Sequence, residues 1–148
     1  MIKRLFCYGT LMAPALFEKI SGVSAVGEAA TLPGYRRYQL QGKPYPAVVR
    51  CPESEVQGCL YHGLGAGQLR RLDKYEGEWY RRTLVNVRCA DNNMVKAWCY
   101  VIRGFHAGKL GQQDWSLEEF LRQHLPATME RLSFRNEYGV IHADRVVK

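Results

Sequence analysis

The sequence has no apolar run that approaches the ~18 residues needed for a membrane-spanning helix. The apolar stretch at its N-terminus ends at Tyr8, and Gly9 and Thr10 form a turn directly after it. That stretch is too short for the hydrophobic region of a secretory signal and is typical of a first strand. We therefore expect a cytoplasmic protein with no membrane partner.

The sequence also lacks the usual patterns of a metal site. Its five cysteines include no C-x-x-C pair, and its four histidines pair with no cysteine at ligand spacing. An odd number of cysteines in apolar surroundings is typical of reduced, buried thiols. We expect no metal.

A continuous basic tract is missing as well, although the net charge is +7. The basic residues come as separate pairs, namely Arg36-Arg37, Arg70-Arg71 and Arg81-Arg82. A nucleic-acid surface requires basic residues clustered on one face, with aromatic residues among them. We therefore expect no nucleic-acid partner, and the positive charge favours small anionic substrates.

What is present is a soluble-domain composition and a series of short strands. The 148 residues, 47% of them hydrophobic, contain no repeat or linker and predict one domain over 1–148. A turn at 32–34 separates two of the strands, and 47–49 is a short apolar run. The expected strands are 2–8, 23–31, 35–41, 56–61, 79–88 and 95–102, the last two joined by a hairpin turn at 90–93. With two inserted helices, this pattern predicts an α+β chain with a largely antiparallel sheet or barrel.

A helical extension is expected at 115–135. Ser116 stands at an N-cap position with Glu119 three residues later, and apolar residues follow at helical spacing. Pro126 is expected to break this helix.

The central helix is the stretch Gln68–Gly77. Leu69, Leu72 and Glu76 stand at i, i+3 and i+7, so they share one helix face, and Gly77 is a stop signal. A carboxylate on an apolar face must have a partner or serve in chemistry. The spacing alone leaves open whether Glu76 is a solvated surface group or a functional one.

The loop after the first strand is a second candidate site. Tyr8, Gly9, Thr10 and Leu11 precede an expected short helix over 14–20, with Pro14 in its first turn. A strand, a glycine loop and a helix in that order direct backbone N–H groups at a bound anion. Tyr8 is equally typical of a core strand residue with a satisfied hydroxyl.

Three segments in a fixed order carry a family resemblance: Phe6–Leu11, Tyr45–Val49 and Leu72–Arg82. Together they resemble the γ-glutamylcyclotransferase-like superfamily over Leu5–Val101, most closely its AIG2-like and γ-glutamylamine cyclotransferase branch. The segment 115–125 is similar to the C-terminal extension of plant AIG2-like proteins. The resemblance implies a small, mostly antiparallel β-barrel flanked by helices, with a cavity between barrel and helices.

The same resemblance implies a reaction and its residues. Tyr8, Gly9, Thr10 and Leu11 would hold the glutamyl end of a small-molecule γ-glutamyl substrate, and Glu76 would be the general acid/base. The reaction would release 5-oxoproline and an amine without a metal or any other cofactor. Because the loop reads Thr-Leu, unlike the glutathione-degrading branch, the identity of the leaving amine stays open. The alternative is a non-catalytic binding or regulatory module on the same barrel. The oligomeric state is not determined by the sequence.

Four further residues are possible site residues. Asp73 is expected to pair with Arg70 or Lys74 on its own helix, and Glu78, beyond the helix stop, is expected to be solvated. Tyr80 and Tyr100 are consistent either with a cavity lining or with strand packing.

Overall fold

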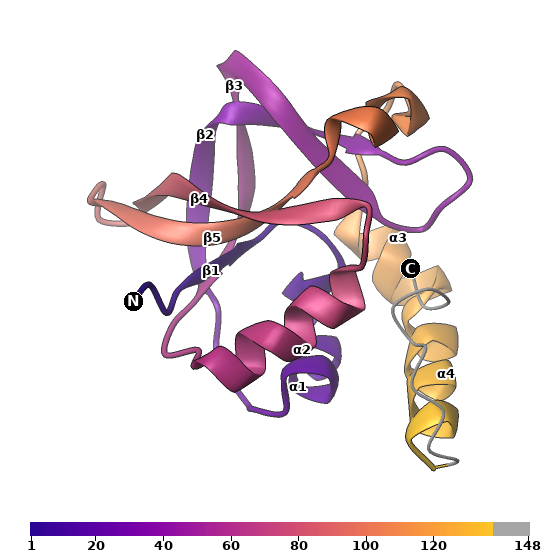
Figure 1. The fold of residues 1–148 in the computed structure, drawn as a ribbon. Helices are drawn as coiled ribbons and strands as arrows, with labels where there is room; N and C mark the ends of the chain where they lie inside the picture. Colours follow the sequence, from indigo (N-terminus) through magenta and orange to yellow (C-terminus); the bar gives the residue numbers. More distant parts are fainter. Residues whose placement is uncertain (138–148) are drawn as a thin grey trace.

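A closed five-stranded barrel forms the centre of the computed structural model, which describes residues 1–137 (Figure 1). The barrel strands follow one another in the order β1, β3, β2, β4, β5. All neighbours pair antiparallel except β1 and β5, which are parallel. The strands are β1 Leu5–Cys7, β2 Glu28–Gln39, β3 Pro46–Tyr61, β4 Tyr80–Cys89 and β5 Met94–Ile102. The predicted small, mostly antiparallel barrel flanked by helices is confirmed.

Helices cover one side and one end of this barrel (Figure 1). A 3₁₀ turn and α1 follow the first strand, α2 lies between β3 and β4, and another 3₁₀ helix and two α-helices follow β5. Their bounds are η1 Thr10–Met12, α1 Pro14–Ser21, α2 Ala66–Glu76, η2 Gly104–Lys109, α3 Leu117–Gln123 and α4 Leu125–Glu137. No helix in the described part of the chain is long and apolar enough to cross a membrane. Residues 138–148 of the expected single domain lie outside the described range.

The apolar residues form two separate clusters because successive side chains of a strand point to opposite faces. In β1, Phe6 belongs to the cluster inside the barrel, whereas Leu5 and Cys7 belong to the cluster under the helices. In β4, Val85 and Val87 are buried while Leu84 is exposed, which is the same alternation of faces.

The predicted turn at 32–34 is wrong, and so is the division of this region into two strands, 23–31 and 35–41. β2 runs continuously through Pro33 and Gly34, and Leu32 is fully buried. The register changes from Pro33 opposite Glu55 to Tyr35 opposite Arg50, so residues 51–54 of β3 bulge out opposite Gly34. Gly34 has a φ of 82°, which a residue with a side chain rarely adopts. The Pro-Gly pair therefore bends a long strand pair rather than ending it.

The C-terminal part of the described chain forms two helices, α3 and α4, and the helical run breaks close to Pro126, as expected. Ser116 accepts a hydrogen bond from Glu119 N–H and begins α3, as its N-cap position predicted. α3 ends at Gln123, with His124 as its C-cap, and Pro126 lies in the first turn of α4, where proline is tolerated. The 3₁₀ helix η2 lies in the connection between β5 and α3.

The segment that precedes α3 is tied to the rest of the fold by side chains. Trp115 Nε1 donates to Pro44 O at 2.7 Å. Arg37 pairs with Asp114 at 2.7 Å and donates to Tyr8 O at 2.8 Å. Residues 114 and 115 therefore hold both the end of β1 and the start of β3 from outside the barrel.

The contact between β1 and β3 yields a stability test at Gly58. A Cβ there would lie 2.3 Å from Cys7 O and 2.7 Å from Phe6 Cζ. We expect Gly58→Ala to lower the free energy of unfolding by about 1–3 kcal/mol because the strands must move apart. Gly67→Ala in α2 is the control, since a Cβ there meets no atom within 4 Å. Urea denaturation that gives both variants the same stability would contradict the account.

Candidate active site

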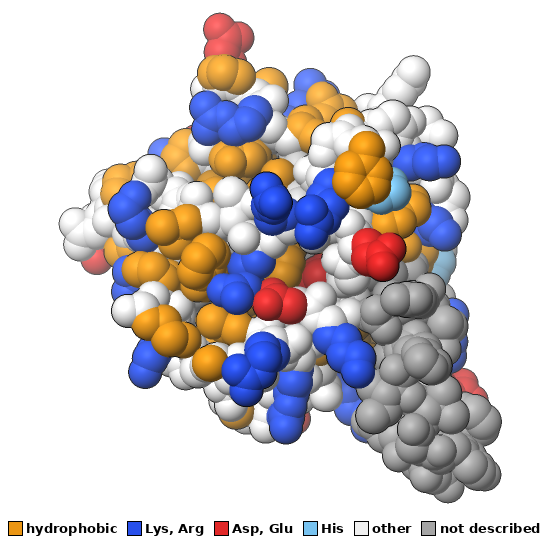
Figure 2. Space-filling view, viewed as in Figure 1, with side chains coloured by type: hydrophobic (Ala, Val, Ile, Leu, Met, Phe, Trp, Pro, Cys, Tyr) orange, Lys and Arg blue, Asp and Glu red, His pale blue; other side chains and the backbone are white. Residues whose placement is uncertain are grey.

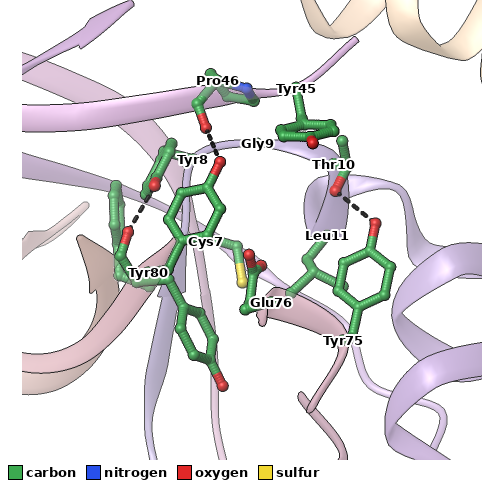
Figure 3. Close-up of a pocket in the computed structure, with 12 residues that line it drawn as sticks. Cys7, Tyr8, Gly9, Thr10, Leu11, Tyr45, Pro46, Tyr75, Glu76 and Tyr80 are labelled. Atoms are coloured by element: carbon green, nitrogen blue, oxygen red, sulfur yellow. Dashed lines mark hydrogen bonds between the residues drawn. The ribbon is translucent and has the colours of Figure 1, made fainter. Parts of the chain in front are cut away.

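A pocket opens where the end of β1, the start of β3 and the end of α2 meet (Figure 3). It holds about 390 Å³ of space not filled by atoms, including the solvent at its mouth. The predicted site residues Tyr8, Gly9, Thr10, Leu11 and Glu76 all line it. Three segments far apart in the sequence thus contribute to one cavity, and the expected site residues are brought together.

Glu76 reaches the pocket because of the phase of α2. Leu69 and Leu72 are buried on the barrel-facing side, as predicted, and Glu76 follows on the last turn. Gly65 N–H donates to Gln68 Oε1 at the helix start, and Gly77, with a φ of 75°, ends the helix. The carboxylate points into the pocket, beside the sulfur of Cys7 and between the side chains of Tyr75 and Tyr80 (Figure 3).

Position 9 requires glycine because its backbone lies close to Pro46 on the opposite wall of the pocket. A Cβ on Gly9 would lie 2.9 Å from Cγ and 3.0 Å from Cδ of Pro46. Real Cβ contacts are essentially never shorter than 3.0 Å. The backbone of the loop therefore approaches Pro46 as closely as glycine alone allows.

Backbone N–H groups of the same loop are available on the pocket wall. The first hydrogen bond of η1 runs from Met12 N–H to Gly9 O at 2.9 Å. Within residues 1–137, no hydrogen bond joins the N–H group of Thr10 or Leu11 to another protein atom. The first N–H groups of a helical turn carry partial positive charge and bind anions.

Tyrosine hydroxyls hold the walls in place. Tyr80 Oη donates to Pro46 O at 2.7 Å, and Tyr8 Oη donates to Tyr100 O. Thr10 Oγ1 and Tyr75 Oη lie 3.1 Å apart, in hydrogen-bond contact. The hydroxyl of Tyr8 therefore bonds to the backbone, as expected of a satisfied core tyrosine, while its ring lines the cavity.

The tyrosines are held in their neutral form. Burial, and next the charge of Glu76, raise the pKa of Tyr45 to about 12. Burial and then the Glu76 charge also raise the pKa of Tyr75, Tyr80 and Tyr100 well above the usual tyrosine value. The pocket thus surrounds a carboxylate with phenols that keep their protons and can donate hydrogen bonds.

Cys7 is a buried thiol on the same wall. Burial first, and then the charges of Cys59 and Glu76, raise its pKa well above the usual value. A thiol with a raised pKa is a poor nucleophile. The chemistry that the pocket offers therefore rests on the carboxylate, the phenols and the backbone amides.

Helix spacing predicted that Asp73 pairs with Arg70 or Lys74, and this prediction is wrong. The carboxylate of Asp73 accepts from Arg82 Nε and from Tyr100 Oη, both at 2.8 Å. The partners come from β4 and β5, which pack beside α2, so spacing within the helix could not indicate them. Glu78 is exposed, as expected.

The sequence interpretation assigned no site role to several lining residues. Tyr80 and Tyr100, left between cavity lining and packing, do line the pocket. The lining residues that the sequence interpretation did not indicate are Phe6, Cys7, Tyr45, Pro46 and Tyr75. Their signal was present, since Tyr45-Pro46 and Tyr75 belong to the segments that carry the resemblance. Among the described residues, no three His, Cys, Asp or Glu side chains gather as a metal site.

The raised pKa of Tyr45 predicts a loss of stability in alkali. A phenol with a higher pKa in the folded state contributes stability that is fully present below its unfolded pKa of about 10. This contribution is lost as the pH rises through the folded pKa of about 12. We expect the free energy of unfolding to fall less steeply over this interval in Tyr45→Phe than in wild type. Equal slopes in urea denaturation across the interval would contradict the assignment.

Comparison with known proteins places the chain in a family. Residues 5–117 match the family model described as "Gamma-glutamyl cyclotransferase, AIG2-like". "Protein AIG2 C" of Arabidopsis thaliana is 32% identical over 127 residues, which cover 85% of this chain and 76% of the relative.

Solved structures agree in fold. A solution structure from Arabidopsis thaliana has a TM-score of 0.69 at 28% identity, and the match covers 94% of this chain and 84% of the chain in that structure. A structure described as "Gamma-glutamyl cyclotransferase" has a TM-score of 0.63 at 18% identity, and the match covers 90% of this chain and 87% of the chain in that structure. At this identity the match shows a shared fold alone. The chain described here belongs to the gamma-glutamyl cyclotransferase, AIG2-like family.

Proposed function

We propose that the protein is a γ-glutamyl cyclotransferase, which converts a γ-glutamyl substrate into 5-oxoproline and a free amine. The observation that carries the proposal is the Glu76 carboxylate, set at the end of α2 in a pocket of neutral phenols. A pocket that only binds has little reason to keep a carboxylate in such surroundings. Family membership supports the same reaction class.

The reaction is an intramolecular aminolysis. The substrate's α-amine attacks its own γ-carbonyl carbon, a new C–N bond closes the ring, and the bond to the departing nitrogen breaks. The nucleophile is part of the substrate, so the protein must mainly fix the conformation that brings amine and carbonyl together. Close walls such as Gly9 against Pro46 are suited to this task.

Glu76 would move the protons. The α-amine, with a pKa near ~8, is mostly protonated at neutral pH and must lose a proton before it attacks. The departing nitrogen must gain one before it leaves. A carboxylate within reach of both nitrogens can accept the first proton and return it as the second.

The loop residues would bind the charged and reacting oxygens. The N–H groups of Thr10 and Leu11 are suited to the substrate α-carboxylate or to the oxyanion that develops on the γ-carbonyl. The hydroxyl of Tyr45, which stays protonated, can add a hydrogen bond to the same oxygens. Tyr8 would act through its ring, because its hydroxyl bonds to Tyr100 O.

The test is release of 5-oxoproline from a panel of γ-glutamyl amines and dipeptides. We expect Glu76→Gln to lower kcat by at least ~10²-fold, because glutamine keeps the shape of the side chain and cannot take up the proton. Glu78→Gln is the matched control, since it makes the same change two residues away on an exposed side chain. Circular dichroism of both variants checks that they fold.

The outcomes distinguish a cyclotransferase that uses Glu76 from the alternatives. Loss of activity in Glu76→Gln with full activity in Glu78→Gln supports the proposal. Equal activity of wild type and Glu76→Gln would show that another group moves the protons. Absence of 5-oxoproline with the whole panel would favour the alternative, a binding or regulatory module.

A further inference from the structure

A groove adjoins the active-site pocket on the face formed by β4, β5 and the end of α2. It holds about 640 Å³ outside the atoms, open solvent included. Figure 2 shows Lys and Arg side chains gathered on this face, around a hollow. The residues that give the groove its character are Asp73, Arg81, Arg82, Trp98, Tyr100 and Arg103.

The groove and the pocket share walls. Tyr80 and Tyr100 line both spaces. Gly77, the residue that follows Glu76, lines the groove. Figure 3 shows Glu76 with Thr10 and Tyr75 on one side and Tyr80 on the other. A substrate whose glutamyl end is held by the loop of Thr10 would therefore have its departing end on the side of Tyr80 and the groove.

The charge in the groove is unevenly compensated. Arg82 pairs with Asp73, with 2.8 Å between Nε and Oδ1, and lies over the ring of Trp98, with 4.5 Å between Cζ and the ring centre. Tyr100 Oη also donates to Asp73. In contrast, neither Arg81 nor Arg103 forms an ion pair within the described residues. The carboxylate of Asp73 is already occupied, so the positive charge of these two arginines is left for a ligand.

We propose that this groove binds the carboxylate of the leaving group, so that the preferred substrates are γ-glutamyl amino acids rather than γ-glutamyl derivatives of uncharged amines. This inference rests on the proposed cyclotransferase activity. In an amino acid leaving group, the carboxylate carbon lies only about 2.5 Å from the departing nitrogen. A basic side chain that binds this carboxylate must therefore lie close to the pocket, as the arginines of the groove do.

The atoms balance without a further reactant. The lactam nitrogen keeps one of the three hydrogens of the α-ammonium group. The other two go to the departing nitrogen, which leaves as the ammonium group of a free amino acid. The carboxylate of the leaving group is unchanged and serves only for recognition.

The experiment compares γ-glutamylalanine with its C-terminal amide, γ-glutamylalaninamide, which differs in that one charge. We expect wild type to prefer the carboxylate form in kcat/KM by about tenfold, the value of a charged hydrogen bond. The double variant R81Q/R103Q should lose most of this preference, mainly through KM. Arg36→Gln is the charge control, since Arg36 is an exposed residue of β2 that lines a different groove.

Binding of the same two ligands to Glu76→Gln, measured by calorimetry, separates this inference from the proposed activity. Turnover of both ligands at equal kcat/KM would overturn the inference and leave the cyclotransferase standing. Absence of turnover, together with carboxylate-selective binding that R81Q/R103Q removes, would sustain the groove as a carboxylate site and overturn the activity. Preference that persists in R81Q/R103Q, or that Arg36→Gln removes equally, would overturn the groove assignment.

Discussion

The site depends on the contacts that meet at Pro46. The backbone of Gly9 lies against one side of its ring, closely enough that a Cβ would clash. Its carbonyl accepts the hydroxyl of Tyr80 from the start of β4. The loop after β1, the start of β3 and the segment after α2 are fixed relative to one another through this one residue. Because α2 ends three residues before β4 begins, the same contacts fix the position of Glu76.

Around this junction the fold sets one carboxylate among neutral hydrogen-bond donors. Burial and the carboxylate together keep the phenols protonated, and the phenols in turn bond to backbone carbonyls and to Thr10. The barrel interior and the cluster under the helices support this arrangement from two sides. The groove beyond Tyr80 and Tyr100 extends it with charge of the opposite sign. The molecule thus offers two neighbouring environments, a pocket of neutral phenols around a carboxylate and a groove lined by arginines.

The sequence predicted those features of the fold that depend on residues close together in the chain. The face of α2, its stop at Gly77 and the alternation of β4 follow from side-chain periodicity, so they were visible in the sequence. The Pro33-Gly34 pair was misread because a bulge and a turn use the same residues, and only pairing with β3 distinguishes them. The partner of Asp73 was missed for a related reason, since Arg82 reaches it through the packing of β4 beside α2. Site membership of Tyr75 and Pro46 likewise depends on tertiary contacts that spacing does not encode.

In the proposed reaction the substrate's own amine displaces the leaving group, with no water in the step. The most direct test of this step is turnover of γ-glutamylalanine in ¹⁸O-labelled water, with products identified by mass spectrometry. Intramolecular aminolysis gives unlabelled 5-oxoproline and free alanine, and no glutamate. Glutamate that carries ¹⁸O in its γ-carboxylate would show hydrolysis and contradict the account.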